Sequence, residues 1–224
     1  MREIVVDTET TGLDPQAGDR VVEIGCVELA NHLPTGREFQ VYLNPERDIP
    51  PAAQAIHGLS LEFLISKPRF AEIADSFLEF VGDAPLIMHN AEFDRGFLNA
   101  ELERIGRAPL PASQVVDTVQ IARRKHPGAP ANLDALCRRF DIDTARRTRH
   151  GALLDAQLLA EVYLHLRGGR QPGLALASSG ASATAAAGKP RARNRAPRPH
   201  TPSDDERAAH AAFVEGLSDP IWRR

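Results

Sequence analysis

The order of apolar segments along residues 1–170 constrains the fold of this chain most strongly. Three strand-like segments come first, at Ile4–Asp7, Val21–Leu29 and Glu38–Leu43, and turn-forming residues separate them. Helix-like and strand-like segments then alternate: helices are predicted near 70–81, 91–105, 118–125, 133–140 and 151–166, and strands at Leu86–His89 and Val115–Val116. This order predicts an α/β fold with one mixed β-sheet flanked by helices.

Composition excludes several classes of protein. The chain has 224 residues and a formal net charge of −3, so it is no polycation that holds nucleic acid by bulk charge. Its only cysteines, Cys26 and Cys137, lie in apolar runs, which indicates buried thiols and argues against a disulfide scaffold. No apolar run approaches the roughly 20 residues of a membrane helix, and no signal-peptide pattern opens the chain. We therefore expect a cytoplasmic protein without a membrane partner.

The chain is predicted to have three parts. Residues 1–170 form the folded domain. In residues 171–203, Ala, Ser, Gly and Pro predominate and every charged side chain is basic. Such a segment buries too little apolar surface to offset the entropy of ordering, so a flexible, disordered linker is expected there. Residues 204–224 change character again.

The C-terminal part is predicted to form a short helix that binds a partner. Ser203 and Glu206 fit a capping box, and an apolar stripe follows at Ala209, Phe213, Val214 and Leu217, with Trp222 beyond Pro220. A helix this short is marginal alone in water. We expect Phe213, Leu217 and Trp222 to anchor it on a partner, and the alternative is a tail that docks on its own domain.

Four acidic residues lie where apolar side chains would be expected. Asp7 and Glu9 follow the buried-strand run Ile4-Val5-Val6 and emerge on the same face of an extended chain. Asp94 and Asp155 lie on the apolar stripes of two predicted helices. A buried, unpaired carboxylate costs several kcal/mol, so such acids are retained with a partner or a metal. One of them alone could be a structural hydrogen-bonding group, but four together indicate a shared site.

The ligand types indicate the metal. Carboxylate oxygens suit Mg²⁺ or Mn²⁺ and argue against zinc. Two divalent cations would balance the four carboxylates, which is the arrangement of two-metal phosphodiester hydrolysis. His150 stands five residues before Asp155 and is a candidate general base that takes a proton from the attacking water.

Three motifs carry a family resemblance. Asp7-Thr-Glu9-Thr-Thr-Gly12, His89-Asn-Ala-Glu-Phe-Asp94 and His150-Gly-Ala-Leu-Leu-Asp155 resemble those of the DEDDh 3′–5′ exonucleases of the DnaQ-like family. The resemblance implies a ribonuclease-H-like fold, metal binding by the residues matching Asp7, Glu9, Asp94 and Asp155, and a general base at His150. It also implies substrate contacts from Asp7, Glu9 and Asp155, and from His57 in the segment Ile56-His57-Gly58-Leu59. The residues before His57 depart from some relatives in lacking an acid.

Within that family the chain resembles the proofreading (epsilon) subunits of bacterial DNA polymerase III. In those subunits a C-terminal peptide binds the polymerase (alpha) subunit, which matches the predicted role of residues 204–224. The segment 171–176, with Gln171, Leu174 and Leu176, resembles a peptide that binds the sliding clamp. The implied function is removal of mismatched nucleotides from the DNA 3′ end, single-stranded or frayed.

Two other functions stay open from the sequence alone. An RNA-trimming nuclease could use the same residues, although it would not need the linker and tail. A non-catalytic adaptor is the other alternative, and the presence of all four acids and the histidine argues against it. Arg146, Arg147 and Arg149 are interpreted either as lining the path of the phosphate backbone or as a solvated loop.

Overall fold

The computed structural model describes residues 1–145, 147, 149–169 and 201–216. The chain divides into two compact units, 1–175 and 176–224, and the described residues of each are considered by themselves. Most of the predicted linker, including the segment 171–176 with Gln171, Leu174 and Leu176, lies outside the described residues. Leu217 and Trp222 also lie outside them.

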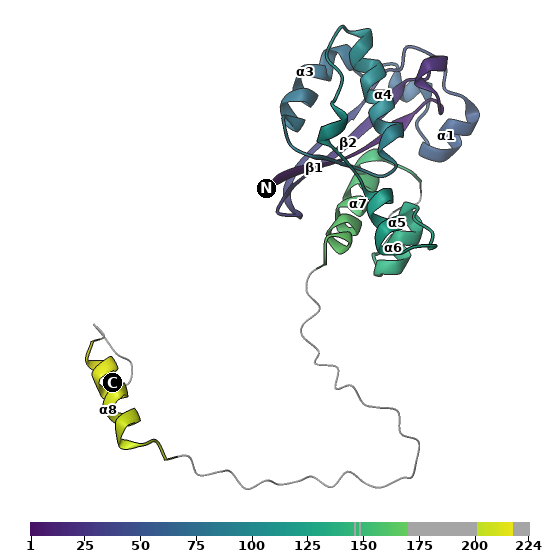
Figure 1. The fold of residues 1–224 in the computed structure, drawn as a ribbon. Coiled ribbons are helices and arrows are strands. Elements are labelled where there is room, and N and C mark those ends of the chain that lie inside the picture. The colour runs from purple at the N-terminus through teal and green to yellow at the C-terminus, as the bar shows by residue number, and fades with distance from the viewer. Residues whose placement is uncertain (146, 148, 170–200, 217–224) are drawn as a thin grey trace, which may run out of the picture. The chain divides into compact units, whose positions relative to one another are not determined.

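The first unit is built on one five-stranded mixed sheet (Figure 1). The strands are β1 (Arg2–Thr10), β2 (Val21–Ala30), β3 (Leu33–Tyr42), β4 (Leu86–Met88) and β5 (Val115–Asp117). Their order across the sheet is β3-β2-β1-β4-β5. Strands β1, β2 and β3 pair antiparallel, whereas β4 pairs parallel with both β1 and β5. The predicted mixed sheet is confirmed, and β1 is its central strand.

Helices cover both faces of this sheet. The predicted helices are found within about two residues of their expected ends, which is the usual scatter of helix boundaries. The helical elements are η1 (Pro15–Ala17), α1 (Pro51–His57), α2 (Leu61–Leu64), α3 (Phe70–Val81), α4 (Ala91–Arg104), η2 (Ala112–Gln114), α5 (Thr118–Lys125), α6 (Leu133–Phe140) and α7 (Ala152–Leu166). Helices α1 and α2 were not among the predictions.

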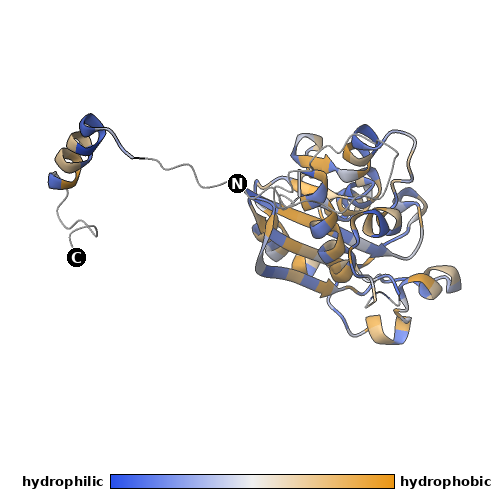
Figure 2. Ribbon diagram, turned by 90° about the horizontal axis from the view of Figure 1, so that it is seen from below, coloured by the Kyte–Doolittle hydropathy of each residue, from blue (hydrophilic) through white to orange (hydrophobic). Residues whose placement is uncertain are grey.

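Alternation along β1 divides the core into two layers. Ile4 and Val6 belong to a buried cluster with residues of α3 and α4, and Val5 belongs to a second cluster with residues of α5, α6 and α7. Figure 1 shows these two sets of helices on opposite sides of the strands, and in Figure 2 the apolar residues concentrate on the strands. Because side chains alternate between the faces of a strand, Asp7 and Glu9 follow Val5 onto the α7 side.

Strand β3 differs from its prediction. The sequence predicts a strand over Glu38–Leu43, whereas β3 spans Leu33–Tyr42. Its first half is exposed and lacks the apolar alternation that marks a half-buried strand. A tight turn joins β2 to β3, with left-handed backbone at Asn31 (φ 51°) and His32 (φ 68°).

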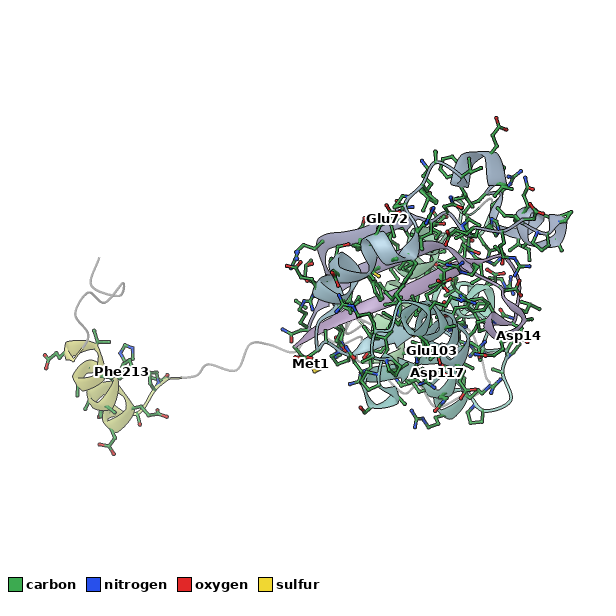
Figure 3. All side chains as sticks on the ribbon, turned by 90° about the horizontal axis from the view of Figure 1, so that it is seen from above. Met1, Asp14, Glu72, Glu103, Asp117 and Phe213 are labelled. Atoms are coloured by element: carbon green, nitrogen blue, oxygen red, sulfur yellow. The ribbon has the colours of Figure 1, made fainter. Side chains whose placement is uncertain are left out.

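The carboxyl ends of the parallel strands meet at one edge of the sheet. Strand β4 ends at Met88 and leads into α4, and β5 ends at Asp117 and leads into α5. Asp117 caps α5 by accepting a hydrogen bond from the Val119 amide, and Asn132 caps α6 in the same way. Figure 3 marks the two ends of β1, with Met1 before it and Asp14 after its carboxyl end. Ligand sites of open α/β sheets lie at this kind of edge.

The second unit contains the predicted C-terminal helix, α8 (Asp204–Glu215). The capping box is present: the Ser203 hydroxyl accepts from the Glu206 amide at 3.2 Å, and the Ser203 amide donates to the Glu206 carboxylate at 2.8 Å. Phe213, labelled in Figure 3, is 64% exposed among the described residues. Within the described part of the chain, no helix combines the length and the apolar character that a membrane span needs.

Candidate active site

A pocket at the carboxyl end of β1 brings the predicted residues together. Asp7 and Glu9 come from β1, Asp94 from the first turn of α4, and Asp155 from the first turn of α7. His150 lies in the loop before α7. The remaining lining residues are Thr8, His89, Asn90, Phe93, Asn132, Leu133, Asp134 and Arg147. Residues more than 140 positions apart in the sequence therefore line one cavity. The sequence predicts such a shared site, because acids stand at positions where apolar side chains would be expected.

Asp94 is held against β1 by two hydrogen bonds. The Thr8 amide donates to Asp94 Oδ1 at 3.0 Å, and the Thr8 hydroxyl donates to the same oxygen at 2.7 Å. The Asp94 side chain is buried, with 4% of the residue exposed. Both bonds go to Oδ1, and Asp94 lines the pocket.

The start of α7 is placed by close contact with β2. The buried Glu23 carboxylate accepts a hydrogen bond from the Ala152 amide at 3.1 Å, which satisfies an unpaired N–H group at the helix N-terminus. A Cβ atom at Gly25 would lie 2.2 Å from the Ala152 carbonyl carbon, so only glycine lets the two backbones approach this closely. The His150 amide donates to the Ile56 carbonyl at 3.3 Å. These contacts hold residues 150–153, which lead into the turn of α7 that carries Asp155.

Burial and mutual repulsion change the acidity of the carboxyl groups. Burial, with the nearby charges of Asp155 and Glu23, raises the pKa of Glu9 to about 8. Burial also raises the pKa of Asp94 to about 7, although the hydrogen bonds from Thr8 oppose this change. The pKa of Asp7 is raised well above its ordinary value by burial and by Asp94 and Asp155. A pocket that resists negative charge in this way favours the binding of cations.

The donor set fits divalent metal ions. Glu9, His150 and Asp155 each offer a ligand atom, and these atoms lie within 4.8 Å of one another. Asp7 and Asp94 line the same pocket and add carboxylate oxygens. An oxygen-rich set of this kind suits hard cations, and the repulsion between the carboxylates is relieved by positive charge.

Arg147 is a site residue whose position the sequence did not settle. Its guanidinium forms a bidentate pair with Asp155, with Nε–Oδ1 at 2.5 Å and Nη2–Oδ2 at 2.7 Å. It also hydrogen-bonds Asp134 and lies 2.9 Å from His150 Nδ1. The interpretation as a solvated loop is wrong for Arg147, whose side chain is 10% exposed and lines the acidic pocket, whereas a place along the path of the phosphate backbone stays a prediction. The only sequence feature that could have indicated this position is that Arg147 stands three residues before His150 in a basic run. Many surface loops contain such a run.

His57 borders an adjoining, more apolar cavity. Residues from the end of β1 and from α1 line this cavity, together with Phe93, which also lines the acidic pocket. The Leu59 amide donates to His57 Nδ1 at 3.0 Å, so Nε2 carries the proton of the neutral ring. Nε2 is buried and has no hydrogen-bond partner within the described residues. Burial lowers the pKa of His57, which keeps the ring neutral with one unused donor.

Solved structures with the same fold are DEDDh and related exonucleases. The chain is similar to Exonuclease X in complex with 5′ overhanging duplex DNA, with a TM-score of 0.56 at 25% identity over 73% of this chain and 89% of that one. It is also similar to the nuclease domain of 3′hExo, a DEDDh family member bound to rAMP, with a TM-score of 0.65 at 17% identity over 74% and 91% of the two chains. The sheet and its flanking helices therefore form the ribonuclease-H-like exonuclease fold.

Sequence comparisons give the family. The RNase_T family, described as exonuclease, matches residues 4–163. The DNA polymerase III subunit epsilon of Rickettsia felis is 57% identical over 174 residues, which are 76% of each chain. The subunit of the same name from Escherichia coli K12 is 46% identical over 187 residues, or 80% of this chain and 76% of that one. The chain therefore belongs to the RNase_T exonuclease family and, within it, to the epsilon subunits of DNA polymerase III.

Proposed function

We propose that this pocket hydrolyses the terminal phosphodiester at DNA 3′ ends, and that the protein is the proofreading 3′–5′ exonuclease of a DNA polymerase III. The observation that carries the proposal is the convergence of four carboxylates and one histidine on the carboxyl end of β1 in a chain of the epsilon family. A mismatched end frays more readily than a paired one, so it enters a single-strand site at lower cost.

The proposed ligands of two divalent cations, Mg²⁺ or Mn²⁺, are Asp7, Glu9, Asp94 and Asp155. Bound there, the ions would activate the attacking water and stabilise the charge on the leaving oxygen. The protein's own contribution is the rigid placement of the acids, since Thr8 holds Asp94 and the Glu23 contact holds the first turn of α7.

His150 is the proposed general base. Its side chain is 49% exposed at the pocket, and Nδ1 lies 3.2 Å from Asp155 Oδ2. An imidazole in this place can take a proton from water on the pocket side and release it to solvent on the other side. The hydrogen bond that the His150 backbone amide donates to the Ile56 carbonyl keeps the residue in position while the ring accepts and releases protons.

The substrate strand is proposed to enter past His57. The unused Nε2–H donor of His57 suits a phosphate or sugar oxygen. The apolar cavity beside it, lined by Ile56 and Phe93 among others, suits the face of a terminal base. Together with Asp7, Glu9 and Asp155, His57 would then contact the last nucleotide.

The partners follow from the family and belong to the same proposal. We propose that residues 204–224 bind the polymerase alpha subunit, with Phe213, Leu217 and Trp222 as anchors. Residues 171–176 are proposed to bind the sliding clamp through Gln171, Leu174 and Leu176. If both assemblies form, the protein works on the replicating chromosome, and we accordingly propose that it acts in the cytoplasm of a bacterial cell.

The test compares DNA and RNA directly. We expect the full chain with Mg²⁺ to shorten a 5′-labelled, 3′-mismatched DNA primer stepwise, and to shorten an RNA of the same sequence more slowly. His150→Ala should reduce the rate by about 10²–10⁴-fold, the usual effect of losing a general base. The same variant should keep the rise in melting temperature that Mn²⁺ gives to the folded state by mass action.

The control is His126→Ala, because His126 lies at the end of α5 and lines no part of the pocket. It should keep the full rate. Preferential shortening of the RNA would contradict the DNA assignment, and an unchanged rate in His150→Ala would contradict the role of the base. Loss of the Mn²⁺-induced stabilisation in that variant would make His150 a metal ligand instead.

A further inference from the structure

The Arg147 guanidinium engages both carboxylate oxygens of Asp155. Nε donates to Oδ1 and Nη2 to Oδ2, which is the two-bond geometry that makes arginine–carboxylate pairs strong. The two side chains are 10% and 4% exposed, so the pair is largely shielded from water and from salt. Asp155 is one of the proposed metal ligands, and the guanidinium lies where a cation would approach its oxygens.

The same guanidinium engages His150. Arg147 Nη2 lies 2.9 Å from His150 Nδ1. Arginine has donors and no acceptor, so in this contact Nδ1 accepts the hydrogen bond and the proton of a neutral ring is on Nε2. With Nδ1 occupied and Nε2 protonated, the ring has no free lone pair with which to take a proton from water. Arg147 therefore restrains both a proposed ligand and the proposed base.

Charge explains why the guanidinium lies there. Among the described residues that line the acidic pocket, Arg147 is the only lysine or arginine. Without a cation, carboxylates buried this close together repel one another, and a buried charge that lacks a partner is strongly destabilising. The guanidinium relieves this repulsion from within the chain.

We propose that Arg147 is the counter-cation of the metal-free pocket, and that a divalent ion binds Asp155 only after the guanidinium has left both oxygens. This inference rests on the proposed metal site. Arg147 acts through Asp155 and His150, so it is a positioning residue. Release of the guanidinium couples metal binding to the freeing of His150 Nδ1.

The released side chain has a place to go. A second cavity adjoins the loop before α7 and is lined by Asp134, Arg138, Thr144, Arg149, Arg147 and His150. Arg147 already hydrogen-bonds Asp134, which is on the exposed side of the pocket. By turning about this contact, the guanidinium can leave Asp155 and join Arg138 and Arg149, where three cations would face an incoming phosphate strand.

Competition of this kind weakens the apparent affinity for metal. The dissociation constant is divided by the fraction of molecules in the competent state, so a pair that is closed about nine-tenths of the time weakens binding about tenfold. A variant without the guanidinium should therefore bind the metal more tightly by the same factor. Arg138→Gln is the matched control, since it deletes the same charge from the same cavity and Arg138 forms no ion pair with Asp155 among the described residues.

The experiment measures Mn²⁺ binding to the full chain by calorimetry, without substrate. We expect Arg147→Gln to bind Mn²⁺ about tenfold more tightly than the wild type, and Arg138→Gln to change the affinity by less than about threefold. Equal or weaker binding by Arg147→Gln than by Arg138→Gln would overturn the inference and leave the metal site intact. Absence of binding by the wild type and by both variants would overturn the metal site and the inference together.

A second measurement on the wild type keeps the inference testable if Arg147→Gln does not fold. The Nε–H group of Arg147 gives a nitrogen–proton NMR signal that is protected from exchange while it is bonded to Asp155. Titration with Mg²⁺ should shift this signal and remove its protection at the same metal concentration at which the site fills. A signal that stays shifted and protected at saturation would show that the pair persists beside the metal, which would overturn the inference.

Discussion

At the residue scale, the raised pKa values make the metal-free fold depend on pH. The pKa of Glu9 is about 8 in the folded protein, against an ordinary value of 4.5. At pH values between these two, the folded protein therefore holds a proton on Glu9 that the unfolded chain has released. The stability from this difference is fully present below 4.5 and is lost as the pH rises through about 8. Asp94, with a pKa of about 7, acts in the same direction.

We therefore predict that the melting temperature of the metal-free protein, measured in EDTA, falls as the pH is raised from about 5 to about 8. Mn²⁺ replaces the proton as the neutralising charge, so its stabilising effect should be larger at the upper end of this range. Calorimetric scans at several pH values, with and without Mn²⁺, measure both effects.

Asp94→Asn serves as the control. The asparagine carbonyl can still accept from the Thr8 amide and hydroxyl, but it neither titrates nor repels its neighbours. This variant should melt higher than the wild type in EDTA at about pH 8 and depend less on pH, while it loses nuclease activity. If its melting temperature falls as steeply with pH as that of the wild type, Asp94 is not a source of the effect.

The acids could be predicted from the sequence because each of them breaks a local rule. Asp7 continues a buried strand, and Asp155 lies on an apolar helix stripe, so burial of a charge could be foreseen from pattern alone. Arg147 breaks no such rule. A long basic side chain in a loop reaches several places, and only the packing of that loop against Ile56 and β2 decides which carboxylate it meets.

At the element scale, the position of α7 depends on one glycine. A Cβ atom at Gly25 would meet the Ala152 carbonyl carbon and the Leu153 amide nitrogen at 2.2 Å, and backbone atoms cannot rotate away. Helix α7 carries Asp155, and the preceding loop carries His150. A displacement of the helix start would therefore move two proposed catalytic-site residues away from β1.

We predict that Gly25→Ala destabilises the protein by about 1–3 kcal/mol, the usual cost of overpacking, and that it reduces nuclease activity further than the loss of folded protein explains. Urea unfolding and single-turnover cleavage measure the two effects. Gly96→Ala, in the middle of α4 with open space around its Cβ position, should instead stabilise by about 0.4–1 kcal/mol. An active, fully stable Gly25→Ala protein would contradict the close approach.

Helices α1 and α8 show where sequence patterns fail and where they succeed. Helix α1 has seven residues, begins after Pro50 and has no side-chain cap, so neither length nor capping indicates it. Its role is positional, because it places Ile56 against the His150 loop and His57 beside the apolar cavity. By contrast, the cap residue Ser203 with Glu206 was enough to predict α8, since a capping box is a local interaction.

At the scale of the whole molecule, catalysis and assembly are predicted to be separable. The acidic pocket is complete within residues 7–155, and α8 belongs to the other compact unit. Deleting residues 204–224 should leave cleavage of single-stranded DNA unchanged and abolish co-purification with the polymerase alpha subunit. A tether raises the local concentration of the nuclease site near the primer end without new contacts. Proofreading during synthesis should therefore also decline when the tether is deleted.

Phe213→Ala in the full chain tests the same prediction with a smaller change. Phe213 is 64% exposed on α8, so its removal should not unfold the helix. We expect weaker association with the alpha subunit and unchanged nuclease activity on a free strand. Association of the truncated protein at wild-type strength would place the tether elsewhere in the chain.

The central position of β1 has a consequence for the newly made protein. Strand β1 supplies Asp7 and Glu9 first, whereas His150 and Asp155 leave the ribosome only after nearly the whole folded unit. Until α7 emerges, the sheet face around Val5 lacks the helix that buries it. A nascent or prematurely terminated chain thus has neither a closed core nor a complete reaction centre. We therefore expect fragments that lack α7 to leave DNA intact, because the proposed reaction centre needs Asp155 from that helix.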